Sequence, residues 1–207
     1  MRLVSSFAVL VCISLAALAA QSPAGWKVRA DRSTSATDPD GAGTIKFTAA
    51  GKGFHAVNPQ AAVYWNPANT AKGAYTLKGT FTLNQPSGHT NYYGLVFGGS
   101  GLEGASQAYT YFLVAQDGTF LVKKRMGDAK TDDVVAKTPN AAIKKPDASG
   151  KSTNVLEVRV GADKVDYVVN GTVVGSSPKT GLATDGMWGA RVNHLLDVNI
   201  DDIGTGK

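Results

Sequence analysis

The sequence predicts an all-β protein in which two antiparallel sheets pack face to face. Between Trp26 and Ile203, apolar and polar residues alternate with a period of two, and almost no stretch repeats with the period of a helix. Such alternation buries one face of a pleated sheet and leaves the other in water. About a dozen short strands of this kind, separated by turn-forming residues, are typical of a β-sandwich.

The first twenty residues are predicted to be a signal peptide and not part of the domain. Arg2 precedes a run from Leu3 to Leu18 that is apolar apart from three serines, and Ala17-Leu18-Ala19 is a small-x-small cleavage signal. Cleavage near Ala20 would leave one domain, residues 21–207, in the periplasm or outside a bacterial cell, without a membrane span. A retained N-terminal anchor is the alternative.

The composition excludes several classes of site. Cys12 is the only cysteine and lies in the leader, so the mature chain would have no disulfide, thiol nucleophile or cysteine metal site. Removal of Arg2 lowers the formal charge from +5 to +4. The basic residues form short clusters, such as Lys123-Lys124-Arg125, and not a long stripe. We therefore expect no nucleic-acid partner, and we expect a monomer.

The predicted strands of the first half are separated by proline-containing breakers. The clearest strand alternates from Tyr75 to Leu83, and Asn58-Pro59 and Asn66-Pro67 are each predicted to end a strand. The strands are expected at residues 24–33, 44–49, 53–57, 61–65 and 72–84.

The second half carries two strong hairpin signals. Asn170-Gly171 suits a type I′ turn, because both central residues of that turn need a positive φ, and Asp117-Gly118 predicts another tight connection. The polar stretch 137–152 contains two prolines and is expected to be irregular. Strands are expected at residues 91–97, 107–115, 119–126, 154–161, 165–170 and 172–175, with one or two more in 185–203.

The order of motifs resembles the concanavalin A-like lectin/glucanase superfamily. The long alternating strand is followed by Tyr-Gly-Leu-Val-Phe, Tyr-Thr-Tyr-Phe-Leu-Val, Asp-Gly-Thr-Phe-Leu-Val, the Val-Asn-Gly-Thr hairpin and Gly-Met-Trp-Gly. Within the superfamily, the chain especially resembles laminin-G-like and 3-keto-disaccharide-hydrolase-like bacterial members. The resemblance covers residues 26–203 and implies a two-sheet jelly roll with a concave face that often binds glycans.

Catalytic patterns are absent from the sequence. Retaining glucanases of this superfamily use a Glu-x-Asp-x-x-Glu strand motif, but Glu103 and Glu157 are the only glutamates and neither has an aspartate two residues on. There is no Gly-x-Ser-x-Gly elbow, and His55, His89 and His194 lie on separate segments without metal-ligand spacing. Glu103 is expected in solvent, and Glu157 is expected to have a cross-strand partner such as lysine.

Alternation assigns a candidate ligand-binding face. Leu95, Phe97, Phe112, Val114, Phe120 and Val122 are predicted to face the core, as are Trp188, Ala190 and Val192. Aromatic rings beside fixed donors suit sugars, because rings stack on sugar C–H groups and hydroxyls need directional partners. A plain cross-strand ladder is the alternative reading. The candidate ligand-binding residues on the opposite face are Tyr92, Tyr109, Tyr111, Lys123, Arg125 and Arg191.

A structural calcium ion is a further possibility, since lectin-like sandwiches often carry one on carboxylate and carbonyl oxygens. The candidate ligands are Asp38, Asp40, Asp201 and Asp202, with ordinary turn and strand-end roles as the alternative. No other cofactor and no catalytic residue is predicted.

Three functions remain open from the sequence. The favoured one is an exported, non-catalytic carbohydrate-binding domain whose partner is a glycan or polysaccharide. The alternatives are a glycoside hydrolase of the 3-keto-disaccharide type and a structural envelope domain without a small ligand.

Overall fold

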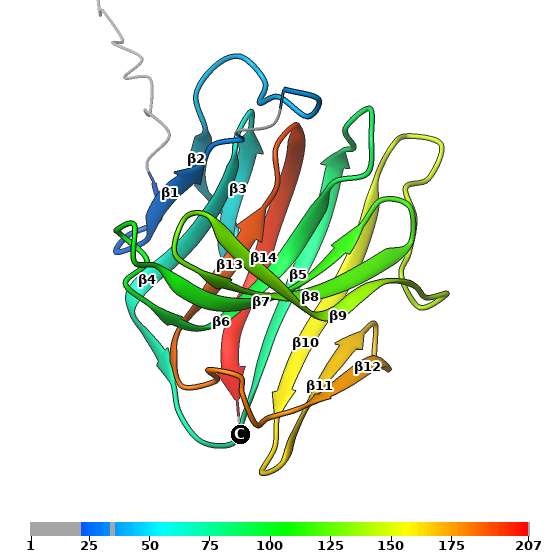
Figure 1. The fold of residues 1–207 in the computed structure, drawn as a ribbon. Coiled ribbons are helices and arrows are strands. Elements are labelled where there is room, and N and C mark those ends of the chain that lie inside the picture. The colour runs from blue at the N-terminus through cyan, green and yellow to red at the C-terminus, as the bar shows by residue number, and fades with distance from the viewer. Residues whose placement is uncertain (1–21, 34–35, 207) are drawn as a thin grey trace, which may run out of the picture.

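The protein is a β-sandwich of two seven-stranded antiparallel sheets (Figure 1). A computed structural model describes residues 22–33 and 36–206, so the predicted signal peptide and its cleavage site lie outside the described residues. These two ranges contain fourteen strands and no helix, which confirms the predicted fold class. Accordingly, no helix in the described part of the chain is long and apolar enough to cross a bilayer.

The two sheets are named here the front sheet and the back sheet. The front sheet has the order β1 (Lys27–Asp31), β4 (Ala61–Ala71), β13 (Gly186–Val192), β6 (Tyr92–Ser100), β7 (Ala108–Ala115), β8 (Thr119–Met126) and β9 (Lys130–Pro139). The back sheet has the order β12 (Thr172–Pro178), β11 (Lys164–Val169), β10 (Ser152–Val160), β5 (Tyr75–Gln85), β14 (Leu196–Gly206), β3 (Gly53–Asn58) and β2 (Lys46–Ala50).

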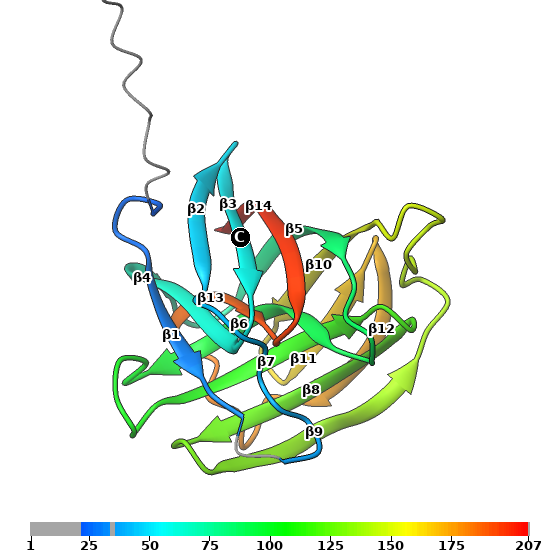
Figure 2. The same cartoon turned by 90° about the horizontal axis from the view of Figure 1, so that it is seen from above.

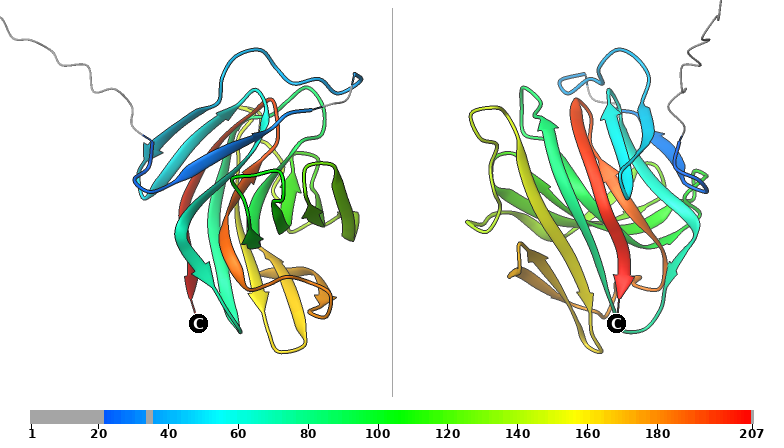
Figure 3. Two further views of the ribbon diagram at one scale, coloured as in Figure 1. Left: turned by 60° about the vertical axis from the view of Figure 1, so that its left-hand side comes forward. Right: turned by 180° about the vertical axis from the view of Figure 1, so that it is seen from behind.

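The sheets form two layers whose strands cross at a wide angle. In Figure 1, β6 to β9 run across the molecule while β5, β10 and β14 run along it behind them. Figure 2 separates the layers, and Figure 3 shows the long back-sheet strands from behind. The loops before β2, between β5 and β6, and between β13 and β14 gather at one end of the sandwich, at the top of Figure 1.

The core between the sheets consists of the residues that alternation predicts. Leu95, Phe97, Phe112, Val114, Phe120, Val122, Trp188, Ala190 and Val192 all belong to one buried cluster. Back-sheet residues such as Leu77, Phe81 and Tyr167 complete it from the other side. Each strand therefore contributes alternate side chains to a single interior, as period-two patterning requires.

A second apolar cluster lies on the outer face of the front sheet. Its buried members are Val63, Trp65, Val96, Leu102, Tyr109, Tyr111, Leu113 and Leu121. Tyr64 and Trp65 point to opposite faces of β4, and both are buried because this second cluster covers Trp65. Leu102, from the glycine-rich loop after β6, closes over the cluster.

Both predicted turns are present. Asn170 and Gly171 have φ values of 51° and 84° between β11 and β12, which confirms the predicted turn type. Gly118, with a φ of 83°, ends the short connection from β7 to β8, where its amide nitrogen donates to the Ala115 carbonyl at 3.0 Å.

Two strand boundaries differ from the predictions. β4 continues past Asn66-Pro67 to Ala71, because the pairing with β13 is irregular there and a missing proline N–H costs nothing outside a regular ladder. Lys130–Pro139 was not predicted as a strand, yet it forms β9. One edge of β9 faces solvent because it is the last strand of its sheet. Such an edge strand has few apolar residues, here mainly Val134 and Val135, so its apolar-polar alternation is weak.

Gly98 offers a test of the packing at the end of β6. Its φ is +62°, and a β-carbon at this position would lie 1.9 Å from the Ala183 carbonyl oxygen. We expect Gly98→Ala to lower the free energy of unfolding by about 1–3 kcal/mol, as measured by urea denaturation. The matched control is Gly104→Ala, since a β-carbon there meets nothing within 4 Å and the change should stay within about 0.5 kcal/mol. Equal stabilities of the two variants would contradict this account.

Candidate functional site: the outer face of the front sheet

A buried charged cluster lies at the edge of the outer face, around the carboxylate of Asp31 at the end of β1. The Asp31 side chain is only 4% exposed. Strands β1, β7, β8 and β13 and the loops beside them supply its neighbours. This Asp31 cluster consists of Arg29, Asp31, Gln107, Tyr109, Arg125, Asp128 and Arg191.

The Asp31 carboxylate is shared by several donors. Its Oδ2 accepts hydrogen bonds from Arg191 Nη1 and, at 3.2 Å, from the Tyr109 hydroxyl. Its Oδ1 accepts from Arg29 Nη1 at 2.8 Å and from Gln107 Nε2 at 3.2 Å. Arg125 Nη1 lies 3.8 Å away. Three guanidinium groups thus surround this one buried carboxylate, and Arg29 also pairs with Asp128.

The environment fixes the protonation of the cluster. Burial alone would raise the pKa of Asp31, but the positive charges of Arg191 and Arg125 outweigh burial and hold its pKa below the ordinary value. Burial raises the pKa of Tyr109 to about 12. At neutral pH Asp31 is therefore an anion, and Tyr109 is a neutral donor.

Beside the cluster, the outer face is hollowed. A hollow of about 220 Å³ is lined by Tyr92, Tyr111, Leu113, Leu121, Lys123, Arg191 and Asn193. We call it the tyrosine hollow. The Arg191 guanidinium carbon lies 5.5 Å from the centre of the Tyr111 ring, and the backbone nitrogen of Asn193 donates to the backbone carbonyl of Tyr92 at 2.9 Å. Aromatic surface and fixed polar groups therefore meet in one small space.

A second, more polar hollow of about 300 Å³ adjoins it and shares Arg191 and Asn193. It is bordered by the Asp31 cluster on one side and by the end loops on the other. Among its lining residues are Asp38, Asp40, Asn91, Arg125 and His194. We call it the polar hollow.

The structure brings four of the six predicted binding residues together in the tyrosine hollow, namely Tyr92, Tyr111, Lys123 and Arg191. Arg125 instead lines the polar hollow. Tyr109 faces away from the core, as predicted, but is only 2% exposed because Asp31 and Arg191 enclose its hydroxyl. Tyr111 is also largely covered, at 6% exposure.

The predicted calcium ligands do not form one group. Asp38 and Asp40 lie in the loop before β2, near His194. Asp201 lies near the β2–β3 turn at Gly51, and Asp202 faces Lys52 of the same turn at 3.9 Å. Calcium binding remains a prediction.

Glu157 has the cross-strand lysine that its position predicted, and Glu103 is exposed to solvent, as predicted. Glu157 lies opposite Lys78 on β5, with Nζ and Oε1 3.4 Å apart, and also pairs with its strand neighbour Arg159. Glu103 is 64% exposed and pairs with Lys27. Neither glutamate belongs to the Asp31 cluster.

Two groupings were missed by sequence reasoning. Asp31 lies at the end of a strand, where an aspartate is ordinary, and Arg191 lies 160 residues away. His89 and His194 are 105 residues apart, yet their Nε2 atoms lie 3.1 Å from each other. No local spacing in the sequence signals either contact, because each depends on which strands become neighbours.

Comparison with solved structures shows that known β-sandwich proteins share this fold. A carbohydrate-binding module, CBM66 from Bacillus subtilis, superposes with a TM-score of 0.63 at 10% identity, over 88% of this chain and 96% of that one. A Bacillus subtilis protein of unknown function with a galectin-like fold gives 0.54 at 11% identity, over 87% and 88%. No protein-family model matches the sequence, and a comparison with curated proteins found no match.

The Asp31 cluster predicts an acid-sensitive stability. Because the folded pKa of Asp31 is lowered, its contribution is complete above its ordinary pKa of 3.8 and is lost as the pH falls through the lower, folded value. We expect Asp31→Asn to cost about 3–5 kcal/mol at pH 7, since it leaves buried arginines without their anion. Urea unfolding measured from neutral pH to below the ordinary pKa should show a shallower acid loss in the variant.

The control for this test is Asp132→Asn, which alters only wider surface pairs with Lys124 and Lys130. Its cost should be below about 1 kcal/mol. An Asp31→Asn variant as stable as this control would show that the cluster contributes little.

Proposed function

We propose that the protein is an exported, non-catalytic carbohydrate-binding domain whose ligand enters the tyrosine hollow. The observation that carries this proposal is the lining of the hollow, where Tyr92 and Tyr111 lie beside Lys123, Arg191 and Asn193. Sugar rings stack their C–H faces on aromatic rings, and their hydroxyls take hydrogen bonds from charged and amide groups.

The polar groups of the hollow are held in place before any ligand arrives. Arg191 is fixed by Asp31 and by the Tyr109 hydroxyl at 2.8 Å, so its remaining donors have a set direction. The side-chain oxygen of Asn193 is buried without a hydrogen-bond partner among the described residues. Preorganised donors and acceptors reduce the entropy lost on binding.

The fold supports the same proposal at a coarser level. One of the structures that this chain resembles is a carbohydrate-binding module, which favours a binding role over a purely structural one. The predicted signal peptide agrees with export from the cytoplasm, and an exported protein would encounter cell-surface and extracellular polysaccharides. The partner would be a glycan or polysaccharide, bound without a paired-carboxylate mechanism.

A structural envelope domain is the second candidate, and one observation favours it. The outer face is partly filled by its own side chains, since Tyr109 and Tyr111 are 2% and 6% exposed. Hydrolysis has less support, because Asp31, the acid that accepts a hydrogen bond from Tyr109, is enclosed by arginines that keep it ionised. A general acid needs a proton to give at working pH.

Affinity electrophoresis in gels containing different polysaccharides tests the proposal. We expect the wild type to be retarded by at least one polysaccharide. Lys123→Ala and Tyr92→Ala should each weaken this binding about tenfold, which corresponds to about 1.4 kcal/mol. Lys124→Ala is the matched control, because Lys124 is the next residue of β8 and does not line the tyrosine hollow.

Binding that survives both hollow variants would place the ligand elsewhere. Absence of retardation by every polysaccharide would favour the structural domain.

A further inference from the structure

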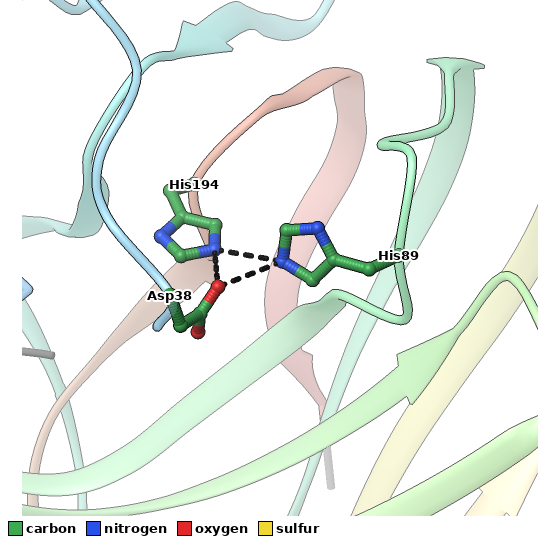
Figure 4. Close-up of side chains that lie close together, drawn as sticks. All are labelled: Asp38, His89 and His194. Atoms are coloured by element: carbon green, nitrogen blue, oxygen red, sulfur yellow. Dashed lines mark hydrogen bonds and ion pairs between the residues drawn. The ribbon is translucent and has the colours of Figure 1, made fainter. Parts of the chain in front are cut away.

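Three loops at one end of the sandwich bring two histidines and an aspartate into contact. Figure 4 shows Asp38 from the loop before β2, His89 from the β5–β6 loop and His194 from the β13–β14 loop, pointing toward a common centre. His194 is buried, with 6% of its side chain exposed, while His89 and Asp38 are about half exposed. The cluster therefore has one buried member and two members that solvent can reach.

The spacing of the three facing atoms matches a metal coordination shell. Asp38 Oδ1 lies 2.9 Å from His89 Nε2 and 3.1 Å from His194 Nε2, and the two Nε2 atoms are 3.1 Å apart. A metal ion with bonds of about 2.0–2.1 Å holds neighbouring ligand atoms about 3.0–3.4 Å apart. One ion can thus contact all three atoms with little movement of the side chains.

Hydrogen bonding alone does not satisfy this arrangement. A bond from His89 Nε2 to the Asp38 carboxylate needs a proton on that nitrogen, whereas the Asn91 amide, 3.1 Å from the same Nε2, needs its lone pair. The two Nε2 atoms would likewise present two protons to each other if both donated to Asp38. Coordination of a cation by both lone pairs removes the clash between the two imidazoles, and the Asn91 amide then keeps Ser87 Oγ, 3.2 Å from its Nδ2, as its acceptor.

Asp40 is placed to orient the buried histidine. Its Oδ1 lies 3.4 Å from His194 Nδ1, and this oxygen is buried without a hydrogen-bond partner in the described ranges. A carboxylate beside Nδ1 favours the tautomer that carries its proton there, which leaves the Nε2 lone pair toward Asp38 and His89. Carboxylates that orient ligating histidines in this way are common behind metal sites.

We propose that Asp38, His89 and His194 bind a divalent transition-metal ion of the Zn²⁺ class. Two imidazole nitrogens with one carboxylate suit zinc and its neighbours, whereas calcium prefers oxygen ligands throughout. The ion would tie the three loops together at the end of the sandwich. Asp38 and His194 also line the polar hollow, so a coordination position not used by the protein opens toward that space.

The test uses the mature protein, freed of metal with a chelator, and then titrated with Co²⁺ as a visible probe and with Zn²⁺ by calorimetry. We expect one ion per chain, a visible Co²⁺ absorption that Zn²⁺ abolishes, and a higher Tm with Zn²⁺ because the ion binds only the folded state. His89→Ala and Asp38→Asn should lose all three signals. Both residues are at least partly exposed, so these variants should keep the fold, as circular dichroism would verify.

The matched control is His55→Ala, because His55 pairs with Asp197 on the back sheet and lies outside the cluster. It should bind metal like the wild type. Asp40→Asn should retain the site with an affinity about 10–100-fold lower, since it removes only the orienting carboxylate. Absence of stoichiometric binding, or equal loss in His55→Ala and His89→Ala, would overturn the proposal whatever the result with polysaccharides.

Discussion

The ion pair between Asp31 and Arg191 determines how the outer face of the front sheet is built. Asp31 ends the edge strand β1, and Arg191 projects from β13, two strands away in the same sheet. A buried carboxylate is tolerated only where charges and hydrogen bonds compensate for the lost water, and Arg191, Arg29, Tyr109 and Gln107 do so here. The pair thereby fixes β1 at the edge and aims Arg191 at Tyr111.

The outer face combines this fixed charge with apolar surface. Trp65, Val96 and Leu113 pack against one another there, and Leu102 closes over them from a loop. Such packing leaves only small hollows, and the polar groups that border them are already held by neighbours. A face of this kind selects ligands by fit and by a few directed contacts more than by area. The neighbouring end loops add a separate chemistry, since histidines and carboxylates meet there.

Period-two alternation was sufficient to predict the two sheets and the core side of β6, β7, β8 and β13, and the Asn170-Gly171 pair was sufficient to predict its hairpin. It failed where other forces decide. β9 is an edge strand with little apolar content, and β4 tolerates Pro67 because its pairing is irregular there. Exposure of the outer face was misjudged, because a strand pattern cannot show that Tyr109 and Tyr111 bury each other. The contacts of Asp31 with Arg191 and of His89 with His194 depend on topology alone.

The position of β1 has a consequence for how the molecule assembles. Its neighbour β4 comes after β2 and β3 in the first half of the chain, but β13, which pairs with β4 on the other side and carries Arg191, comes near the end. The partners Asp31 and Arg191 are 160 positions apart, so their contact cannot form until most of the polypeptide has been made. Long-range pairings of this kind slow folding. A truncated or stalled chain would expose an unpaired sheet edge, to which other chains can bind.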